Sequence, residues 1–297
     1  MRSRLVAIVA ALTAIALPLS LGACGGEEES QADQTKARTA VHTDFDADNF
    51  SDSTKIDNRF SPLEPGMQFT YEGRSNRGGG RLPHRVIFTV TGLTKEIDGV
   101  RAVTLWDRDI NAGKELEGEL AFWAQDDDGN VWLLGEYPEE YDDEGNFEAA
   151  PDTWFSGIDR ARAGIMMRGN PQPGTGTYRQ GYAPTIGFGD VAFVQKTGQR
   201  ACVPTGCYED VLITDETNPE EPKDGHQLKY YAPRVGNIQA APGRGGVERE
   251  ILELTKFVRL SPGALEFANK EALEMEKRAY VKRKDVYGTT PPLEPIE

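Results

Sequence analysis

The segment LAFWAQDDDGNVWLL, residues 120–134, decides the fold class. Its flanks, 120–125 and 131–134, carry the aromatic and branched apolar residues that are enriched in β-strands. Between them the chain reads DDDGN, and an Asp-Gly pair between apolar runs is a strong hairpin signal. The segment therefore predicts two antiparallel strands joined by a tight turn.

Further strand signals lie on both sides of this hairpin. Residues 67–72 predict a first strand, and in residues 85–91 every second side chain is apolar, as expected for a half-buried strand. An Asp-Gly turn at residues 98–99 leads into another strand. We therefore expect a mainly β fold, a curved antiparallel sheet or barrel with one C-terminal α-helix. The later strands are expected at 178–183, 191–197, 208–214, 227–232 and 247–260.

Two segments break the strand pattern. Residues 154–189 are rich in Gly and Pro and predict a long irregular loop, which is usually a functional feature of a compact domain. Near the C-terminus, Ser261-Pro262 is a typical helix start, with an N-cap followed by Pro at the first helical position. Apolar residues then recur at helical spacing, so we expect a helix over 261–287 packed on the β domain.

Five regions follow from these patterns. The body of the protein is expected at residues 56–260, because the acidic stretch before it is too poor in bulky aliphatic residues to fold. The expected order is a signal peptide at 1–23, a disordered acidic tether at 24–55, the antiparallel β domain at 56–260, the helix at 261–287 and a Pro-rich tail at 288–297.

The charge balance excludes one class of partner. The chain has 48 acidic and 33 basic residues, a formal net charge of −15, so it repels phosphate backbones and nucleic-acid binding is not expected. Aromatic residues make up 9% of the chain, enough apolar surface to build a folded body.

The N-terminus resembles that of a bacterial lipoprotein. Arg2 and Arg4 precede an apolar stretch at residues 5–19, and residues 21–24 read LGAC, which is similar to a lipobox. The resemblance implies that Cys24 is acylated and becomes the mature N-terminus. The protein would then lie on the extracytoplasmic face of the bacterial cell membrane and hold the membrane through this acyl anchor. The alternative is an ordinary secretory signal in which Cys24 is incidental.

The two remaining cysteines predict a disulfide. Cys202 and Cys207 enclose Val-Pro-Thr-Gly, a sequence that suits a tight reversal. An exported protein folds in an oxidising compartment, where such a pair forms a disulfide. A redox-active pair would need the C-x-x-C spacing, and a zinc site would need more ligands than the scattered histidines offer.

Calcium is the one cofactor for which the sequence gives a signal, and no other cofactor is expected. Asp126, Asp128 and Asn130 superficially match a calcium-binding loop. Counting back from Gly129, however, places Ala124 at the first ligand position, where no side-chain oxygen is available. A plain hairpin turn is the preferred interpretation, and calcium is retained as a hypothesis.

A candidate ligand-binding site lies on the predicted 154–189 loop. Ile165, Met166 and Met167 are adjacent apolar residues on this loop, and Trp154 lies at its start. Soft apolar side chains on a loop can line an apolar cavity. The alternative is that the loop folds over the core and buries them.

Enzymatic motifs are absent from the sequence. It contains neither a Gly-x-Ser-x-Gly elbow nor a His-Glu-x-x-His zinc motif, and the three histidines lack catalytic context. Hydrolysis by paired carboxylates stays open, but 48 acidic residues offer no unique pair. We therefore name no catalytic residue and expect a protein that is not an enzyme.

Three strings carry a second resemblance: residues 62–72 (PLEPGMQFTYE), 123–132 (WAQDDDGNVW) and 230–236 (YYAPRVG). Together they are similar to a family of uncharacterised secreted bacterial β proteins, over most of residues 56–290. This resemblance implies a secreted β fold and no particular activity. More remotely, the predicted architecture is similar to envelope carriers of the LolA and LppX type, whose curved sheet holds acyl chains; that likeness concerns architecture alone.

The functional expectation combines these points. The leading hypothesis is a lipid-anchored envelope protein that binds or carries an apolar ligand, such as a lipid, or an envelope partner. One alternative is an extracellular hydrolase that uses carboxylates with calcium assistance, and another is a structural, wall-associated protein. The sequence does not define an oligomeric state.

Overall fold

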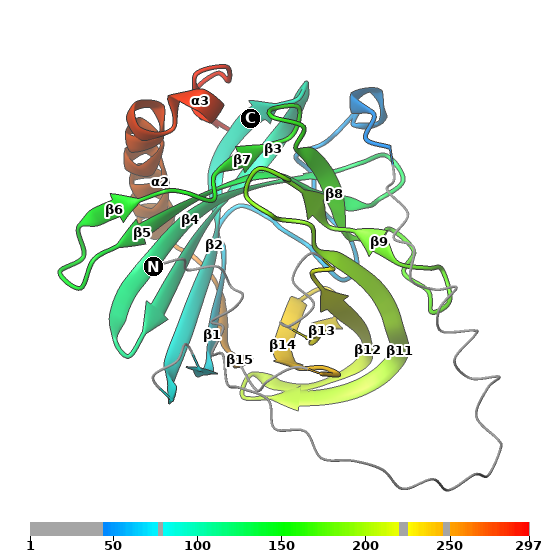
Figure 1. Ribbon diagram of the computed structural model, residues 1–297. Coiled ribbons are helices and arrows are strands. Elements are labelled where there is room, and N and C mark those ends of the chain that lie inside the picture. Colours follow the sequence, from blue (N-terminus) through cyan, green and yellow to red (C-terminus); the bar gives the residue numbers. More distant parts are fainter. Residues whose placement is uncertain (1–43, 77–79, 220–224, 246–249, 297) are drawn as a thin grey trace, which may run out of the picture.

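The computed structural model describes residues 44–76, 80–219, 225–245 and 250–296. Within these ranges the chain forms one antiparallel sheet that curls into a nearly closed barrel, with helix α2 on its outer side (Figure 1). The predicted fold class, mainly β with one C-terminal helix, is therefore confirmed. Along the sheet the strand order is β10-β8-β5-β4-β3-β2-β1-β15-β14-β13-β12-β11-β9.

The elements have the following bounds. A short 3₁₀ helix, η1, precedes the barrel, and two α-helices follow it. They are η1 (Ala47–Asn49), β1 (Met67–Asn76), β2 (Arg81–Ile97), β3 (Val100–Asn111), β4 (Lys114–Gln125), β5 (Val131–Tyr141), β6 (Phe147–Ala149), β7 (Trp154–Phe155), β8 (Arg162–Met167), β9 (Tyr178–Arg179), β10 (Gly181–Tyr182), β11 (Val191–Val203), β12 (Gly206–Thr217), β13 (Gln227–Ala232), β14 (Gly236–Pro242), β15 (Glu250–Arg259), α2 (Pro262–Lys282), α3 (Lys284–Tyr287) and β16 (Glu294–Pro295).

The hairpin that decides the fold joins β4 and β5. Its turn is closed by Asp126 N donating to Asn130 O at 2.9 Å and by Gly129 N donating to Asp126 O at 2.9 Å. Gly129 has φ +80°, a conformation that glycine adopts without strain. The predicted turn is confirmed.

The barrel closes through one short segment. Tyr178 and Arg179, in β9, pair with β11, and Gly181 and Tyr182, in β10, pair with β8. Between them Gln180 N donates to Asp190 O at 2.8 Å. Because β9 and β10, the two terminal strands of the sheet, belong to one continuous segment, the two ends of the sheet meet there.

The prediction of a long irregular loop over 154–189 is wrong. This region contains β7, β8, β9 and β10, each only two to six residues long. Strands of that length show too few alternations to be detected as a pattern. Gly164 also has a packing role that its loop-like composition hides, because a Cβ at this position would collide with the backbone of Gly181.

The sheet buries apolar residues on both faces. Inside the barrel, one cluster includes Phe69, Val90 and Leu105. On the outside, α2 covers β2–β5 with a stripe of small residues that lets the helix approach closely.

Helix α2 begins as the sequence predicted. Ser261 is its N-cap, and the side chain of Ser261 accepts a hydrogen bond from Ala264 N. None of the described helices is both long and apolar enough to cross a membrane. The buried residues of α2 are Ala268, Ala272, Met275, Glu276 and Ala279.

Both predicted terminal boundaries need correction. The folded body reaches back at least to residue 44, because the rings of Phe45 and Phe50 lie 5.6 and 6.0 Å from that of Trp132. The tether therefore does not extend to residue 55. At the other end, the predicted Pro-rich tail contains β16, which pairs with β2, and the buried Leu293. The signal peptide, Cys24 and most of the tether lie outside the described residues.

The cysteine pair closes the end of the β11–β12 hairpin. Cys202 and Cys207 are paired across the two strands and form a disulfide. The intervening turn is completed by Val203 pairing with Gly206. The structure therefore contains the predicted bond.

Candidate binding site at the seam between β14 and β15

The ladder between β14 and β15 is short. On one side, β15 pairs with β1 from Ser75↔Glu250 to Met67↔Arg259. On the other side, β15 pairs with β14 only at Gln239↔Glu253 and Ala240↔Leu252. The C-terminal half of β15 thus has a ladder partner on one edge only. We call this interruption of the barrel wall the seam.

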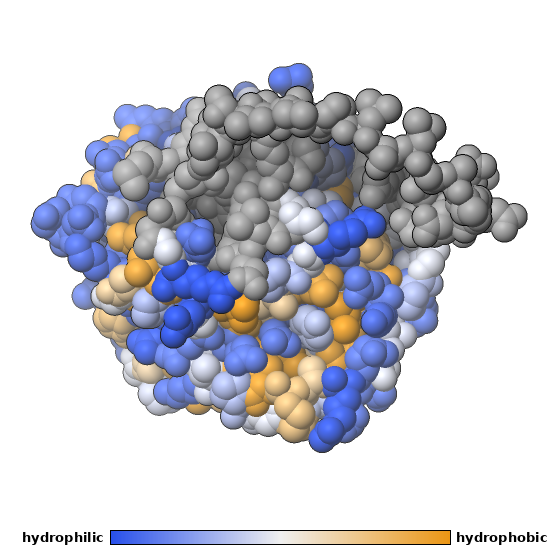
Figure 2. Space-filling model, turned by 60° about the horizontal axis from the view of Figure 1, so that its bottom comes forward, coloured by the Kyte–Doolittle hydropathy of each residue, from blue (hydrophilic) through white to orange (hydrophobic). Residues whose placement is uncertain are grey.

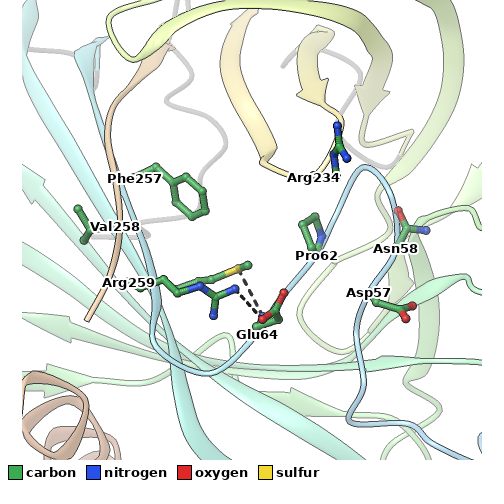
Figure 3. Close-up of a pocket in the computed structure, with 9 residues that line it drawn as sticks. Asp57, Asn58, Pro62, Glu64, Arg234, Phe257, Val258 and Arg259 are labelled. Carbon is green, nitrogen blue, oxygen red and sulfur yellow. Dashed lines mark hydrogen bonds and ion pairs between the residues drawn. The ribbon is translucent and has the colours of Figure 1, made fainter. Parts of the chain in front are cut away.

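A pocket of about 470 Å³ lies at this seam (Figure 3). Its volume falls in the range of small-molecule sites, roughly 300–1,000 Å³. It is formed by the loop before β1, by the turn between β13 and β14, and by the end of β15. The lining residues are Asp57, Asn58, Pro62, Glu64, Met67, Arg234, Phe257, Val258 and Arg259.

Asn58 fixes the loop that forms one wall of the pocket. Its side-chain oxygen accepts from Phe60 N at 2.8 Å and Ser61 N at 3.1 Å. Its amide nitrogen donates to Gly129 O at 2.8 Å and to Arg168 O at 3.1 Å. Because all these bonds are made within the chain itself, the wall is formed before any ligand arrives.

A tight turn presents Arg234 at the opposite wall. The turn links Ala232 to Gly236, the last pair of the β13–β14 ladder. Arg234 has a left-handed backbone, with φ +64°, and its backbone N donates to Arg59 O at 2.6 Å. The position of Arg234 is therefore fixed by its backbone, and its exposed side chain extends from a rigid base.

The apolar part of the pocket is continuous with the barrel core. Phe257 stacks on Phe69, with ring centroids 4.9 Å apart and planes 13° from parallel. Met67 is buried beside them, and Pro62 and Val258 complete the apolar lining. In Figure 3, Phe257 and Arg259 lie on one side and Arg234, Asn58 and Asp57 on the other, with Pro62 and Glu64 between them.

The acidic groups of the pocket have partners. Glu64 Oε2 lies 2.6 Å from Arg259 Nη2. Asp57 accepts from Gln125 Nε2 at 2.8 Å and lies 3.5 Å from Lys55 Nζ. The hydrogen bond from Gln125 and, to a lesser degree, the charge of Lys55 lower the pKa of Asp57. Each of these carboxylates therefore has a basic side chain within 4 Å.

A row of acidic residues lines the inner face of β3 and β4. Asp107 is paired with Glu119, and Asp109 with Glu117, across the two strands. Together with Glu136 on β5 we call these residues the interior acidic cluster. Like charges placed directly opposite each other are destabilising. The cluster therefore favours states in which some of its members are protonated or compensated.

Burial is the main cause of the shifted pKa values in this cluster. It raises the pKa of Asp107 and Glu119 well above the ordinary range, and neighbouring carboxylates raise both further. Burial also raises the pKa of Glu136 to about 7, although the indole of Trp154 donates to Glu136 Oε2 at 2.9 Å and opposes the shift. Part of the cluster thus holds protons at neutral pH.

Two basic side chains compensate neighbouring acids. His84 Nε2 lies 2.9 Å from Asp109 Oδ1, and His84 Nδ1 lies 2.9 Å from Glu250 Oε1. Burial by itself lowers the pKa of His84, but these two carboxylates raise it to about 9, so the ring is an imidazolium. Lys229 Nζ lies 2.9 Å from Glu216 Oε2. The interior of the barrel therefore contains buried ion pairs as well as an apolar core.

The predicted ligand-binding residues lie elsewhere. Ile165, Met166 and Met167 are on strand β8, and Trp154 is on β7. Ile165, Met167 and Trp154 are buried, Ile165 in the outer apolar cluster and the other two in the inner one. Met166 is half-buried against the inner cluster. None of them lines the pocket, and their role in ligand binding stays a prediction.

The residues proposed for calcium form the hairpin turn. Asp126 accepts from Asn130 N at 2.7 Å, from Asn130 Nδ2 at 2.8 Å and from Trp132 Nε1 at 2.8 Å. Asn130 Oδ1 accepts from Gly169 N at 2.9 Å, whereas Asp128 is exposed. Within the described residues, no group of three or more His, Cys, Asp or Glu side chains is placed to hold a metal ion. The calcium hypothesis stays untested.

Sequence reasoning missed the pocket residues. Phe257 lies in a strand and has the same local pattern as a core residue, so nothing in the sequence marks it as part of a pocket. The Pro233-Arg234 pair between two strand signals could have been identified as a turn. Seen from the lower end of Figure 1, hydrophobic residues form separate patches among polar ones (Figure 2).

The chain is similar to two solved structures and to no known family model. No protein-family model and no curated protein matches the chain. Two solved structures are similar to 68% of this chain, each over 99% of its own length and with a TM-score of 0.36. One, 15% identical, is a Bacteroides fragilis protein described as exported and as having a YmcC-like fold. The other, 12% identical, is described as a lipoprotein from Parabacteroides distasonis. Scores of this size do not assign a function.

Proposed function

We propose that this protein is a non-enzymatic binding or carrier protein of the bacterial cell envelope. Acyl chains on Cys24 hold it on the extracytoplasmic face of the membrane, and the seam pocket takes up the apolar part of a ligand. The observation that carries the proposal is the pocket itself, about 470 Å³ in volume and open where the β14–β15 ladder stops.

The chemistry of the lining supports an apolar contribution to binding. Phe257 offers aromatic surface at one end of the pocket, and Met67 and Pro62 add aliphatic surface to its lining. Burying apolar surface is worth about 25 cal/mol per Å², so these contacts favour an apolar group in the pocket, and a preformed site lowers the cost of ordering it. The bonds of Asn58 provide that preformation.

Binding can be measured with the fluorescent apolar probe N-phenyl-1-naphthylamine. The Cys24→Ser variant is used, because it lacks acyl chains that could occupy the pocket. We expect saturable fluorescence enhancement, and a loss of about tenfold in affinity for Phe257→Ser, equivalent to about 1.4 kcal/mol. Phe267→Ser is the matched control, since Phe267 is exposed on α2. Equal affinity in all three proteins would contradict the pocket assignment.

The anchor is tested separately by Triton X-114 partitioning. The sequence around Cys24 is the basis for this part of the proposal. We expect the native protein in the detergent phase and the Cys24→Ser variant in the aqueous phase, because acyl chains supply the membrane affinity. A Cys24→Ser variant that stays in the detergent phase would remove the anchor from the proposal.

A carboxylate-dependent hydrolase is the second candidate, favoured by one observation. Glu136 has a pKa of about 7 and belongs to a cluster with Glu119, so one carboxyl can hold a proton while another is ionised. A screen of glycan, ester and phosphoester substrates, with and without EDTA, tests it. Activity that disappears in Glu136→Gln would favour the enzyme.

A further inference from the structure

Arg234 is the one charged group of the pocket that lacks a partner within the described part of the chain. Glu64 and Arg259 neutralise each other at 2.6 Å. Asp57 is held by Gln125 and lies near Lys55. The guanidinium of Arg234 makes neither a hydrogen bond nor an ion pair with the described residues, although its backbone is fixed by Arg59. The pocket therefore has one uncompensated positive charge.

That charge lies across the pocket from the aromatic surface. Arg234 stands on the β13–β14 turn, whereas Phe257 belongs to β15 on the other side of the seam (Figure 3). A molecule that spans the pocket meets apolar surface at one end and a guanidinium at the other. Such an arrangement suits a ligand with an apolar body and an anionic end.

We propose that the seam pocket binds an amphiphile with an anionic head group, a carboxylate or a phosphate, which pairs with Arg234. The inference rests on the proposed binding function and names its ligand class. Arginine presents a planar fork of donors that matches both head groups and forms two parallel hydrogen bonds with either. Phe257 and Met67 contact the apolar chain.

The acidic character of the rest of the molecule makes the pocket more selective for anions that also have an apolar chain. With a net charge of −15, the protein repels anions at a distance. An anion therefore binds only where a local positive charge and apolar contacts act together. Because Glu64 already has Arg259 as its partner, it repels the head group less than a free carboxylate would.

The experiment is displacement of N-phenyl-1-naphthylamine from the Cys24→Ser protein by four dodecyl compounds below their micelle concentrations. Dodecanoate and dodecyl phosphate carry the two anionic heads, dodecanol is neutral and dodecyltrimethylammonium is cationic. We expect both anions to compete at least tenfold better than dodecanol. The cation should be the weakest competitor. A preference for one anion over the other distinguishes a fatty acid from a phosphate-bearing lipid.

Variants at two arginines connect the preference to Arg234. Arg234→Gln should reduce the affinity for both anions about tenfold and leave that for dodecanol unchanged. Arg234→Lys keeps the charge but loses the planar fork of donors, so it should bind both anions more weakly than the parent protein and more tightly than Arg234→Gln. Arg160→Gln is the matched control, because Arg160 is also exposed and has a similar left-handed backbone, with φ +66°. It should bind like the parent protein.

The outcomes test the head-group assignment and the proposed binding function separately. If the anions bind Arg234→Gln as tightly as the parent, or if dodecanol competes equally well, the head-group assignment is overturned while the binding function stands. If neither the naphthylamine probe nor any dodecyl compound binds, the proposed function itself fails. Loss of anion binding in Arg234→Lys as well as Arg234→Gln, with dodecanol unaffected, would support a bidentate guanidinium contact.

Discussion

Lys95 Nζ lies 2.8 Å from Glu276 Oε1, and this ion pair is almost completely buried between β2 and α2. Lys95 also donates to Pro291 O at 2.7 Å and lies 4.6 Å from the ring centre of Tyr287. Glu276 in turn accepts from Leu293 N at 2.9 Å. The pair thus connects the barrel, the helix and the C-terminal segment.

Removal of one member of this pair should destabilise the protein strongly. A buried charge left without its partner costs about 3–5 kcal/mol. We therefore expect Glu276→Leu to lower the free energy of unfolding by roughly that amount, measured by urea denaturation. The double variant Lys95→Met/Glu276→Leu should be less destabilised than the sum of the single variants, because it leaves no unpaired charge.

An exposed ion pair on the same helix provides the control. Lys277 Nζ lies 2.7 Å from Glu274 Oε1, but both side chains are largely in solvent. Exposed pairs contribute little to stability, so Glu274→Gln should leave the urea midpoint unchanged. Equal effects at Glu276 and Glu274 would mean that burial does not determine the contribution of the Lys95 pair.

The sequence predicts the local features of this fold better than its long-range ones. The β4–β5 turn follows from Asp-Gly chemistry at residues 126–130, and the start of α2 follows from Ser261-Pro262. Both depend only on neighbouring residues. The seam at β14–β15 depends on where two strands stop pairing, and no local pattern encodes that.

The interior acidic cluster is a second feature that the sequence pattern does not predict. In an alternating strand the charged face is normally assigned to solvent. Here α2 covers the apolar outer face that includes Leu120 and Phe122, so Glu119 and Asp107 on the other face point into the barrel. Which face is covered depends on a helix more than 100 residues away along the chain. The position of the cluster inside the barrel is therefore predictable only after the helix has been placed.

Glu136 should make the protein less stable as the pH rises from about 4.5 to about 7. Its pKa is about 7 in the folded state and 4.5 as an ordinary glutamate, so the folded state holds more protons in this window. The free energy of unfolding falls with pH wherever the folded state binds more protons. Glu136→Gln removes this dependence and can still accept from Trp154.

We therefore expect Glu136→Gln to be more stable than the native protein at pH 8, by on the order of 1–3 kcal/mol, and similar to it at pH 4.5. Urea denaturation at the two pH values measures the difference. The same difference at both pH values would show that the substitution acts through packing and not through the proton.

His84 should remain protonated well above neutral pH. Its pKa is raised to about 9 from 6.5 because the carboxylates of Asp109 and Glu250 each lie 2.9 Å from one of its ring nitrogens. Its contribution to stability is therefore complete below pH 6.5 and is lost as the pH rises through 9. An imidazole nitrogen NMR titration should find the charged ring at pH 8. In Asp109→Asn the midpoint should move down toward 6.5, whereas a midpoint unchanged by this substitution would contradict the role of Asp109.

Removal of calcium should leave the β4–β5 turn intact. The carboxylate of Asp126 accepts three hydrogen bonds from Asn130 and Trp132, so the chain itself compensates its charge. A ligand that binds only the folded state raises the melting temperature, and its removal lowers it. We therefore expect the same melting temperature in EDTA and in millimolar calcium. Asp126→Ala should lower it in both conditions, because Trp132 Nε1, Asn130 Nδ2 and Asn130 N lose their acceptor. A melting temperature that falls only in EDTA, and no longer does so in Asp126→Ala, would instead establish the calcium site.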